Sequence, residues 1–405
     1  MINGADTAWL MVSSALVLLM MLPALGFFYG GLVQAKNILS VLFQTFAIAG
    51  VVSLLWFAFV YSEAFSGSGP WIGNLQAVFL QNLPRNAVHP GTTIPESVFV
   101  MFQMTFAIIT PGLIIGATVE RIKFGAVLLF SALWLIFVYA PVCHWVWGGG
   151  YFAVRGTMDF AGGIVVHLTA GVSALLAAWM LGPRHGFPHS VQPPHAPWMV
   201  MVGAALLWVG WFGFNAGSAL KADGNAGMAM LSTHLAAATA TCVWIAIEWI
   251  KYGKPSLVGA VTGAVAGLAT ITPASGFVGP LGAVALGLVG GTVCYGAVHV
   301  VKRMWQVDDA LDVLGVHGVG GALGSLLVPF ATLLGVGGVA LSRPVWDQFL
   351  VQGQAVIVVA LWSVAATFLI IKFVKAVAGW RIDREAEIQG LDFSSHGETG
   401  YNMNG

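Results

Sequence analysis

The chain has 405 residues, of which 58% are hydrophobic and only 8% are charged, and its mean hydropathy is +0.87. A soluble domain usually carries about 25% charged residues, so this composition excludes a soluble globular protein and indicates a membrane protein. The 16 basic and 16 acidic residues cancel, which gives no reason to expect nucleic acid as a partner.

Apolar runs long enough to cross a membrane recur along the whole chain. A spanning helix needs about 20 mostly apolar residues, and the first run lacks the basic leader of a cleaved signal peptide. We therefore predict an all-α polytopic membrane protein with eleven transmembrane helices. The predicted spans lie near residues 8–33, 37–61, 96–119, 124–147, 160–181, 198–218, 224–250, 256–272, 279–301, 312–337 and 347–375.

The distribution of Lys and Arg predicts the orientation of these spans. With eleven spans the termini lie on opposite sides, and all 16 basic residues except Arg85, Arg155, Lys221 and Arg343 fall on one side. Because an excess of Lys and Arg marks cytoplasmic loops, we predict the N-terminus outside and the C-terminus inside the cell membrane. The predicted domains are a transmembrane domain, residues 1–379, and a cytoplasmic C-terminal tail, residues 380–405.

Two stretches place ionisable residues at or inside predicted spans. The first runs from Asp159 to His167 and the second from Asp312 to His317. Ionisable groups in hydrocarbon are costly, and they usually face the interior of a bundle or a polar path. Both stretches are therefore candidates for the functional site.

Aligning the two histidines reveals a weak internal repeat. His167 then stands opposite His317, and Gly171 stands opposite Gly321. Since each half holds five spans, an odd number, the halves have opposite orientation. The sequence thus predicts two inverted five-helix repeats followed by a final helix, an architecture in which a site lies between the repeats.

The histidines have three interpretations. A lone histidine in a helix is commonly a satisfied core residue, whereas His167 and His317 at matching positions could face each other and share a proton. Metal binding is the third, but two histidines without a third ligand nearby make a poor metal site. We predict a pair of pore histidines, with no metal and no cofactor.

The acidic residues of the two stretches also have a structural interpretation. Asp159 precedes an apolar helix, and Asp is a favoured N-cap residue that accepts the free amides of the first turn. Its charge would in addition favour a cation nearby. Asp312 is predicted to be the equivalent cap in the second half.

Aromatic residues gather at the predicted outer ends of three spans. Phe102 and Phe106 lie one turn apart in the third span, Trp147 precedes three glycines, and Phe214 and Ser218 end the sixth span. Tryptophan at a membrane interface is usually a belt residue, whereas a glycine run beside it fits the wall of a vestibule. Because aromatic faces attract cations and a serine hydroxyl accepts hydrogen bonds, these residues predict a site for a small cation with N–H donors.

Motifs spread over most of the spans carry a family resemblance. Besides Asp159–His167, they include Phe27-Phe-Tyr-Gly-Gly31, Glu120-Arg-Ile-Lys-Phe124, Trp147-Gly-Gly-Gly150, Gly315-Val-His317-Gly318 and Gly390-Leu-Asp392. The chain resembles the ammonium transporters of the Amt/Mep/Rh superfamily, specifically the Amt branch. The resemblance runs nearly from end to end.

The resemblance implies a channel-like ammonium/ammonia transporter, not an enzyme. Ammonium would be recruited at an outer site, deprotonated near an aromatic gate, and conducted along a hydrophobic pore. By position, the recruitment residues would be Trp147, Phe102, Phe106 and Ser218, the gate Phe106 and Phe214, the conducting pair His167 and His317, and the supporting acidic residue Asp159.

The resemblance also implies partners and leaves a rival function open. The expected partners are ammonium or its analogue methylammonium, two further copies in a homotrimer, membrane lipid, and a PII-type signalling protein at the cytoplasmic face. An ammonium sensor of the same fold is the main alternative. An intramembrane metal enzyme is a second alternative, which metal analysis of the purified protein would test.

Overall fold

The computed structural model describes residues 1–81 and 83–401, and its regular secondary structure is helical. Within these residues, ten helical segments are long and apolar enough to cross a membrane, and an eleventh, α12 (Leu257–Ile271), is apolar but shorter. The all-α fold with eleven apolar helices is thereby confirmed.

The first five segments are as follows. They are Gly4–Leu32 (α1, Gly4–Leu19, and α2, Gly26–Leu32), Ala35–Phe65 (α3, Ile38–Leu55, and α4, Tyr61–Phe65), Glu96–Ala117 (α5, Glu96–Ile114), Phe124–Val154 (α6, Phe124–Trp134, α7, Ala140–Val146, and α8, Tyr151–Val154) and Gly163–Leu181 (η7, Gly163–Leu168, and α9, Thr169–Leu181).

The remaining segments complete the bundle. They are α10 (Pro197–Gly217), α11 (Gly224–Tyr252), α12, α13 (Pro280–His299, continued to Met304), Leu314–Ala331 (η9, Leu314–Gly318, and α14, Val319–Ala331) and α15 (Val345–Val377). Two short helices, α16 (Arg384–Gln389) and α17 (Leu391–His396), follow in the tail.

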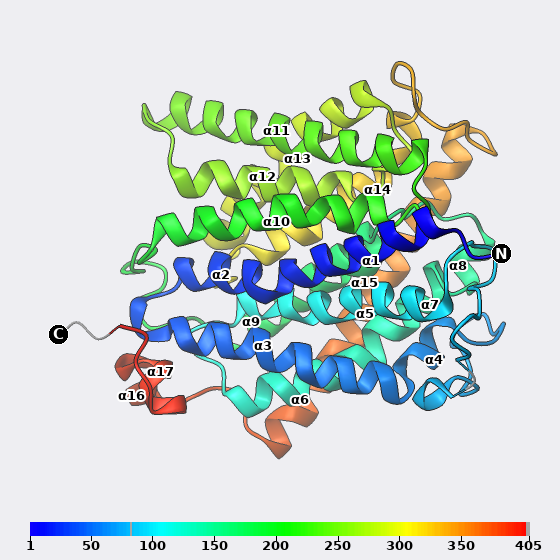
Figure 1. The fold of residues 1–405 in the computed structure, drawn as a ribbon. Helices are drawn as coiled ribbons and strands as arrows, with labels where there is room; N and C mark the ends of the chain where they lie inside the picture. Colours follow the sequence, from blue (N-terminus) through cyan, green and yellow to red (C-terminus); the bar gives the residue numbers. More distant parts are fainter. Residues whose placement is uncertain (82, 402–405) are drawn as a thin grey trace.

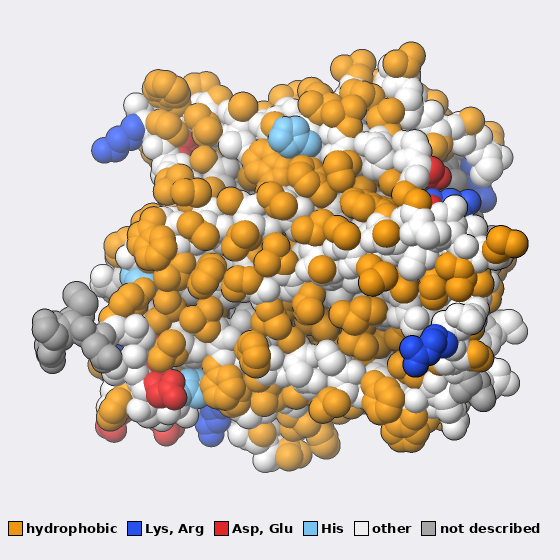
Figure 2. Space-filling model, in the orientation of Figure 1, with side chains coloured by type: hydrophobic (Ala, Val, Ile, Leu, Met, Phe, Trp, Pro, Cys, Tyr) orange, Lys and Arg blue, Asp and Glu red, His pale blue; other side chains and the backbone are white. Residues whose placement is uncertain are grey.

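The long helices lie side by side along a common direction, with the N-terminus and the C-terminal tail at opposite ends (Figure 1). This placement of the termini is the one that an odd number of crossings requires. Figure 2 shows hydrophobic side chains across the middle of one face and charged side chains toward its two ends. Such a distribution suits a protein whose central belt faces lipid. Which end faces the cytoplasm remains the prediction from the basic residues.

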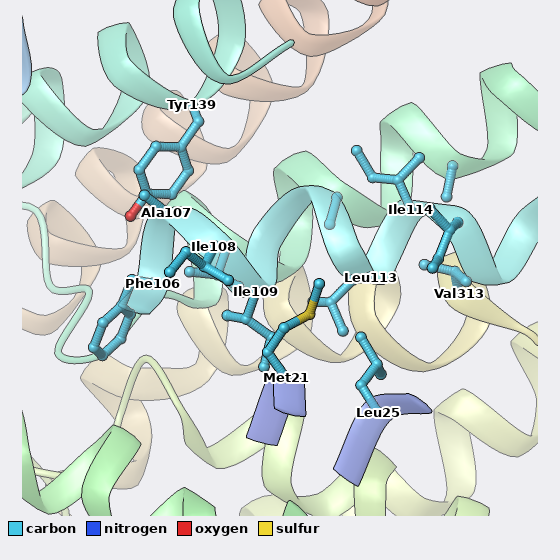
Figure 3. Packing of buried hydrophobic residues seen from close by; sticks show 14 of the residues in the cluster. Met21, Leu25, Phe106, Ala107, Ile108, Ile109, Leu113, Ile114, Tyr139 and Val313 are labelled. Atoms are coloured by element: carbon cyan, nitrogen blue, oxygen red, sulfur yellow. The ribbon is translucent and has the colours of Figure 1, made fainter. Parts of the chain in front are cut away.

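Helix α5 lies at the centre of the bundle. Of its 19 residues, 14 are buried, and Figure 3 shows Met21 and Leu25 of the first segment packed toward Ile109 and Leu113 of α5. A methyl group at Gly112 would lie 2.7 Å from the Met21 sulfur, so the two segments approach closely here. Because α5 is enclosed, its side chains can line an internal path.

The two histidine-bearing segments cross in opposite directions at the middle of the bundle. A methyl group at Gly171 would overlap the backbone of Gly318, and one at Gly321 would overlap the Gly163 carbonyl and lie 3.2 Å from the Leu168 nitrogen. Adding 150 to 171 and subtracting 150 from 318 maps the contact of Gly171 with Gly318 onto the contact of Gly321 with Leu168. This symmetric crossing agrees with the predicted inverted repeats.

A buried charge network joins loops from both halves at the end of the bundle that carries the tail. Arg184 pairs with Glu120 at 2.7 Å and with Asp308 at 2.9 Å, and the fully buried Arg121 donates to the Asp308 carbonyl at 2.6 Å. Burial opposes ionisation of Asp308, but the guanidinium groups of Arg184 and Arg121 hold the pKa of this carboxyl below its ordinary value. The network therefore keeps full charges in place on both sides of the loop interface.

The tail folds back onto the same end of the bundle (Figure 1). The Asp392 carboxylate accepts the backbone N–H groups of Leu39 (3.0 Å) and Ser40 (2.8 Å), so it caps α3. Glu387 accepts the N–H of His185 at 2.7 Å. Over residues 380–401, the segment predicted as a tail thus contacts the start of α3 and the loop that joins the two halves.

Candidate functional site

The predicted outer aromatic residues converge on one cluster. The ring centroids of Phe106 and Phe214 lie 4.3 Å apart, Phe102 lies 5.0 Å from Phe106, and Trp147 lies 5.8 Å from Phe106 at an interplanar angle of 89°. The three phenylalanines are almost fully buried, whereas Trp147 is half-buried. The cluster therefore presents one tryptophan toward the end of the bundle that carries the N-terminus, with three buried phenyl rings beside it.

Ser218 lies beside this cluster at the end of α10. A methyl group at the preceding residue, Gly217, would lie 2.9 Å from the ring of Phe102, so the helix end packs closely on that ring. The Ser218 hydroxyl donates to the Phe214 carbonyl at 2.8 Å. Its oxygen lone pairs remain available as acceptors, and the residue is half-buried.

Asp159 forms the helix cap that the sequence predicts. Its carboxylate accepts the backbone N–H groups of Gly162, Gly163, Ile164 and Val165 at 2.6–3.0 Å. These four amides are the orphan donors at the start of η7 and α9, and they occupy both carboxylate oxygens. Asp159 is therefore a structural anchor of this helix start.

The same residue anchors the outer tryptophan. The Trp147 indole N–H donates to the Asp159 backbone carbonyl at 2.8 Å. Gly162 has a φ of +118°, a conformation that favours glycine, and a methyl group there would lie 3.3 Å from the Trp147 ring. The turn that begins the histidine segment thus also positions Trp147.

The two histidines meet in the interior of the bundle. Their Nδ1 atoms lie 3.2 Å apart, and their ring centroids are 5.2 Å apart at an interplanar angle of 23°. His167 also stacks on Phe214 at 6.0 Å and on Trp211 at 5.5 Å. In this contact one Nδ1 donates and the other accepts, so the pair shares a single proton between the rings.

A narrow cavity of about 10 Å³ is lined in part by the two histidines. This volume is close to the minimum that holds one water-sized molecule, about 10–15 Å³. The walls are apolar apart from the two imidazoles and the indole of Trp211, whose N–H donates to Thr272 at 2.8 Å. The apolar lining is Met20, Leu25, Phe28, Ile109, Leu113, Val166, Leu207, Phe214 and Val265.

A model of the Ammonium Transporter Family matches residues 8–401. The chain belongs to this family. It is 46% identical over 414 residues to a putative ammonium transporter of Methanothermobacter thermautotrophicus, with both chains fully covered, and 43% identical to an ammonium transporter of Bacillus subtilis, with 98% of each chain covered. Family membership and the apolar helices make it a multi-pass protein of the cell membrane, and the family is one of transporters, not enzymes.

Solved structures of the ammonium transporter family share the fold. A structure described as a sensor Amt protein has a TM-score of 0.89 at 30% identity and covers 97% of this chain and 98% of its own. The Mep2 structure of Saccharomyces cerevisiae has a TM-score of 0.86 at 32% identity and covers 95% of this chain and 90% of its own. The arrangement of helices around the histidine pair is therefore the arrangement of the Amt and Mep proteins.

One prediction about this ammonium transporter fold is wrong. Asp309, not Asp312, caps the second histidine segment, because the Asp309 carboxylate accepts the N–H groups of Val313 (3.0 Å) and Leu314 (2.7 Å). Asp312 adopts a φ of +63°, and its carboxylate pairs with Lys302 at 2.7 Å. Burial, with the nearby charge of Asp312, raises the pKa of the Asp309 carboxyl to about 6. The repeat offset of 150 residues maps Asp159 onto residue 309 and could have identified this cap.

Trp211 is a site residue that sequence reasoning missed. It lies three residues before Phe214, so on α10 the two rings share a face, and both stack on His167. The signal for this role was the helical spacing from Phe214. Concerning metals, no group of three His, Cys, Asp or Glu residues with ligating geometry occurs within residues 1–81 and 83–401.

Proposed function

We propose that the chain carries ammonium across the cell membrane through a path that begins at the outer aromatic cluster and passes the histidine pair. The cation is recruited beside Trp147, loses its proton near Phe106 and Phe214, and continues as ammonia past His167 and His317. The observation that carries this proposal is the Nδ1–Nδ1 contact of 3.2 Å inside a cavity of about 10 Å³.

Recruitment follows from the exposure and geometry of the cluster. A cation over an aromatic face gains about 0.5–2 kcal/mol, more where water is excluded. Trp147 is half-buried and therefore accessible, and Ser218 adds a hydroxyl oxygen that can accept an N–H of the cation. An ammonium ion thus finds an aromatic face and an acceptor at the outer end, before the buried Phe106.

Deprotonation follows from the cost of charge in the cavity. An unpaired ion in an apolar interior costs several kcal/mol even after relaxation, and no carboxylate lines this cavity. Neutral ammonia avoids that cost. The histidine pair offers one shared proton and further ring nitrogens, and the His167 Nε2 has no hydrogen-bond partner in the described residues. These groups can exchange hydrogen bonds with ammonia as it passes.

Replacing both histidines tests the path. In proteoliposomes, a His167→Leu/His317→Leu double variant is expected to lose selective ammonium conduction, measured as methylammonium uptake and as current on a supported membrane. A His189→Gln variant, in an exposed loop, serves as the matched control and should conduct like the wild type. Unchanged uptake in the double variant would contradict the proposed path.

The current measurement also addresses a second function. Because a structural neighbour is described as a sensor, the same fold could bind ammonium without carrying it. Ammonium-dependent flux in proteoliposomes supports the transporter, whereas binding without flux supports the sensor. The presence or absence of current separates transport of charge from transport of neutral ammonia.

The assembly and partners form part of the proposal. The resemblance to the Amt branch supports a homotrimer with one pore per subunit. A PII-type signalling protein would dock at the end of the bundle where α16 and α17 pack on the loops. The mass of the purified complex in lipid tests the trimer, and binding of a PII-type protein to vesicles with and without the tail tests the docking.

A further inference from the structure

His144 contacts two backbone carbonyl groups at once. The ring is fully buried at the outer end of α7, three residues before Trp147. Its Nδ1 lies 3.0 Å from the Ala64 oxygen at the end of α4, and its Nε2 lies 2.6 Å from the Gly69 oxygen in the loop that follows. A carbonyl oxygen only accepts hydrogen bonds, so each ring nitrogen must carry a hydrogen. Only the imidazolium cation can donate a hydrogen bond to each of the two carbonyl oxygens.

The glycine run after Trp147 wraps closely around this ring. A methyl group at Gly148 would overlap the Ala64 carbonyl oxygen and lie 2.8 Å from the His144 Nδ1, and one at Gly150 would lie 3.0 Å from the His144 Cδ2. The backbone thus turns around the imidazole and its carbonyl partner. Trp147 begins this turn, so the position of its indole depends on where the ring is held.

The elements packed around the ring carry few acidic side chains. The loop of residues 66–74 has no ionisable side chain, and the Asp159 carboxylate is occupied by four amides. Glu63, adjacent to Ala64 and 7% exposed, is the remaining acidic side chain among the elements packed here. The ionisable residues of these elements are Tyr61, Glu63, Tyr139, Cys143, Tyr151 and Asp159.

We propose that His144 is a positioning residue, held as an imidazolium, which fixes the Trp147 turn and thereby sets the affinity of the outer site for ammonium. The inference rests on the proposed recruitment role of Trp147. A ring that lacked either hydrogen would turn a nitrogen lone pair toward a carbonyl oxygen, and that contact would be repulsive. The loop and the Trp147 turn would then separate, which would weaken recruitment without changing the pore.

A transport experiment separates this role from a merely structural one. His144→Gln keeps a single donor group, so at neutral pH its KM for methylammonium should exceed that of the wild type about two- to tenfold, with an unchanged maximal rate. Measuring the variant and the wild type at the same pH gives both the same fraction of ionised substrate. His189→Gln should have the KM of the wild type.

Two outcomes would overturn the proposal: equal KM values for His144→Gln and the wild type, or a lower KM in His144→Gln. Because this variant could fail to fold, a second measurement uses the wild type. Nitrogen-15 NMR of histidine-labelled protein in lipid should show one buried histidine with both ring nitrogens protonated, assigned as the signal absent from His144→Gln.

A neutral ring at His144 in that spectrum would also overturn the inference, whatever the transport data show. Failure of the proposed function has a different signature, because it requires undiminished conduction by the His167→Leu/His317→Leu variant and leaves the protonation of His144 untouched. The two failures can therefore be told apart.

Discussion

Replacing Gly321 with alanine perturbs the histidine pair through one methyl group. The added carbon would lie 2.7 Å from the His167 Cβ and would overlap the Gly163 carbonyl oxygen. Ordinary contact between such atoms begins at 3.4 Å, so His167 or α14 must move by about 0.7 Å. Neither obstacle is a flexible chain end, because Cβ and the carbonyl are tied to the backbone. The methyl therefore displaces the segment that carries the histidine.

The expected losses follow from this displacement. A movement of about 0.7 Å along the line between the Nδ1 atoms takes their separation from 3.2 Å to about 3.9 Å, beyond hydrogen-bond range. Loss of one hydrogen bond corresponds to about 0.5–1.5 kcal/mol, a factor of about 2–12 in rate if the bond supports conduction. Overpacking should also lower the free energy of unfolding by about 1–3 kcal/mol.

Methylammonium uptake by proteoliposomes and thermal unfolding in detergent measure these two effects. Gly50→Ala is the matched control, because a methyl group at that exposed position meets nothing within 4 Å. A Gly321→Ala protein that unfolds at the wild-type temperature and conducts at the wild-type rate would refute the reasoning. So would an equal loss of rate in Gly50→Ala.

Three further substitutions test the charges near the second histidine segment. Asp309→Ala should destabilise the fold by about 0.5–2 kcal/mol through loss of the helix cap. Asp312→Ala breaks a partly exposed ion pair and should cost at most about 1 kcal/mol. Thermal unfolding measures both effects, and equal changes in unfolding temperature would contradict the assignment of the cap. Asp308→Asn should destabilise by about 3–5 kcal/mol, because it leaves Arg184 and Arg121 facing a neutral group. Since the folded pKa of Asp308 lies below its ordinary value of 3.8, its stabilisation is complete above that pH and disappears as the pH falls through the folded pKa. Acid unfolding should therefore be less steep in Asp308→Asn, and an unchanged acid profile would argue against the role of this carboxylate.

The spans could be predicted because hydropathy is a local property. Each segment needs enough apolar residues to reach across the hydrocarbon, and the span near residues 256–272 was predicted even though its helix, Leu257–Ile271, is short. The histidine pair could be predicted because the repeat places His167 and His317 at matching positions of two opposed halves. The aromatic residues could be predicted as a cation site from their places near the ends of three spans, whereas their division into recruitment and gate residues came from the family resemblance.

The features that sequence reasoning missed depend on backbone angles and on helix crossings. The choice between Asp309 and Asp312 depends on the left-handed turn at residue 312, which directs that carboxylate toward Lys302. The double contact of His144 depends on a loop, residues 66–74, that comes from a different span. Neither the turn nor the loop contact leaves a pattern in the hydropathy.

The meeting of the two histidines across the crossing also affects how the chain is made. His317 follows His167 by 150 residues, so at a synthesis rate of about 5–20 residues per second His167 is synthesised about 8–30 s before its partner. During that interval its imidazole has no second ring to bond, and the glycine surface around it has no opposing helix. Insertion of the first five helices must therefore leave this surface open until the second half arrives. A nascent chain on a ribosome stalled between the two halves would contain only those residues of the pore lining that belong to the first half.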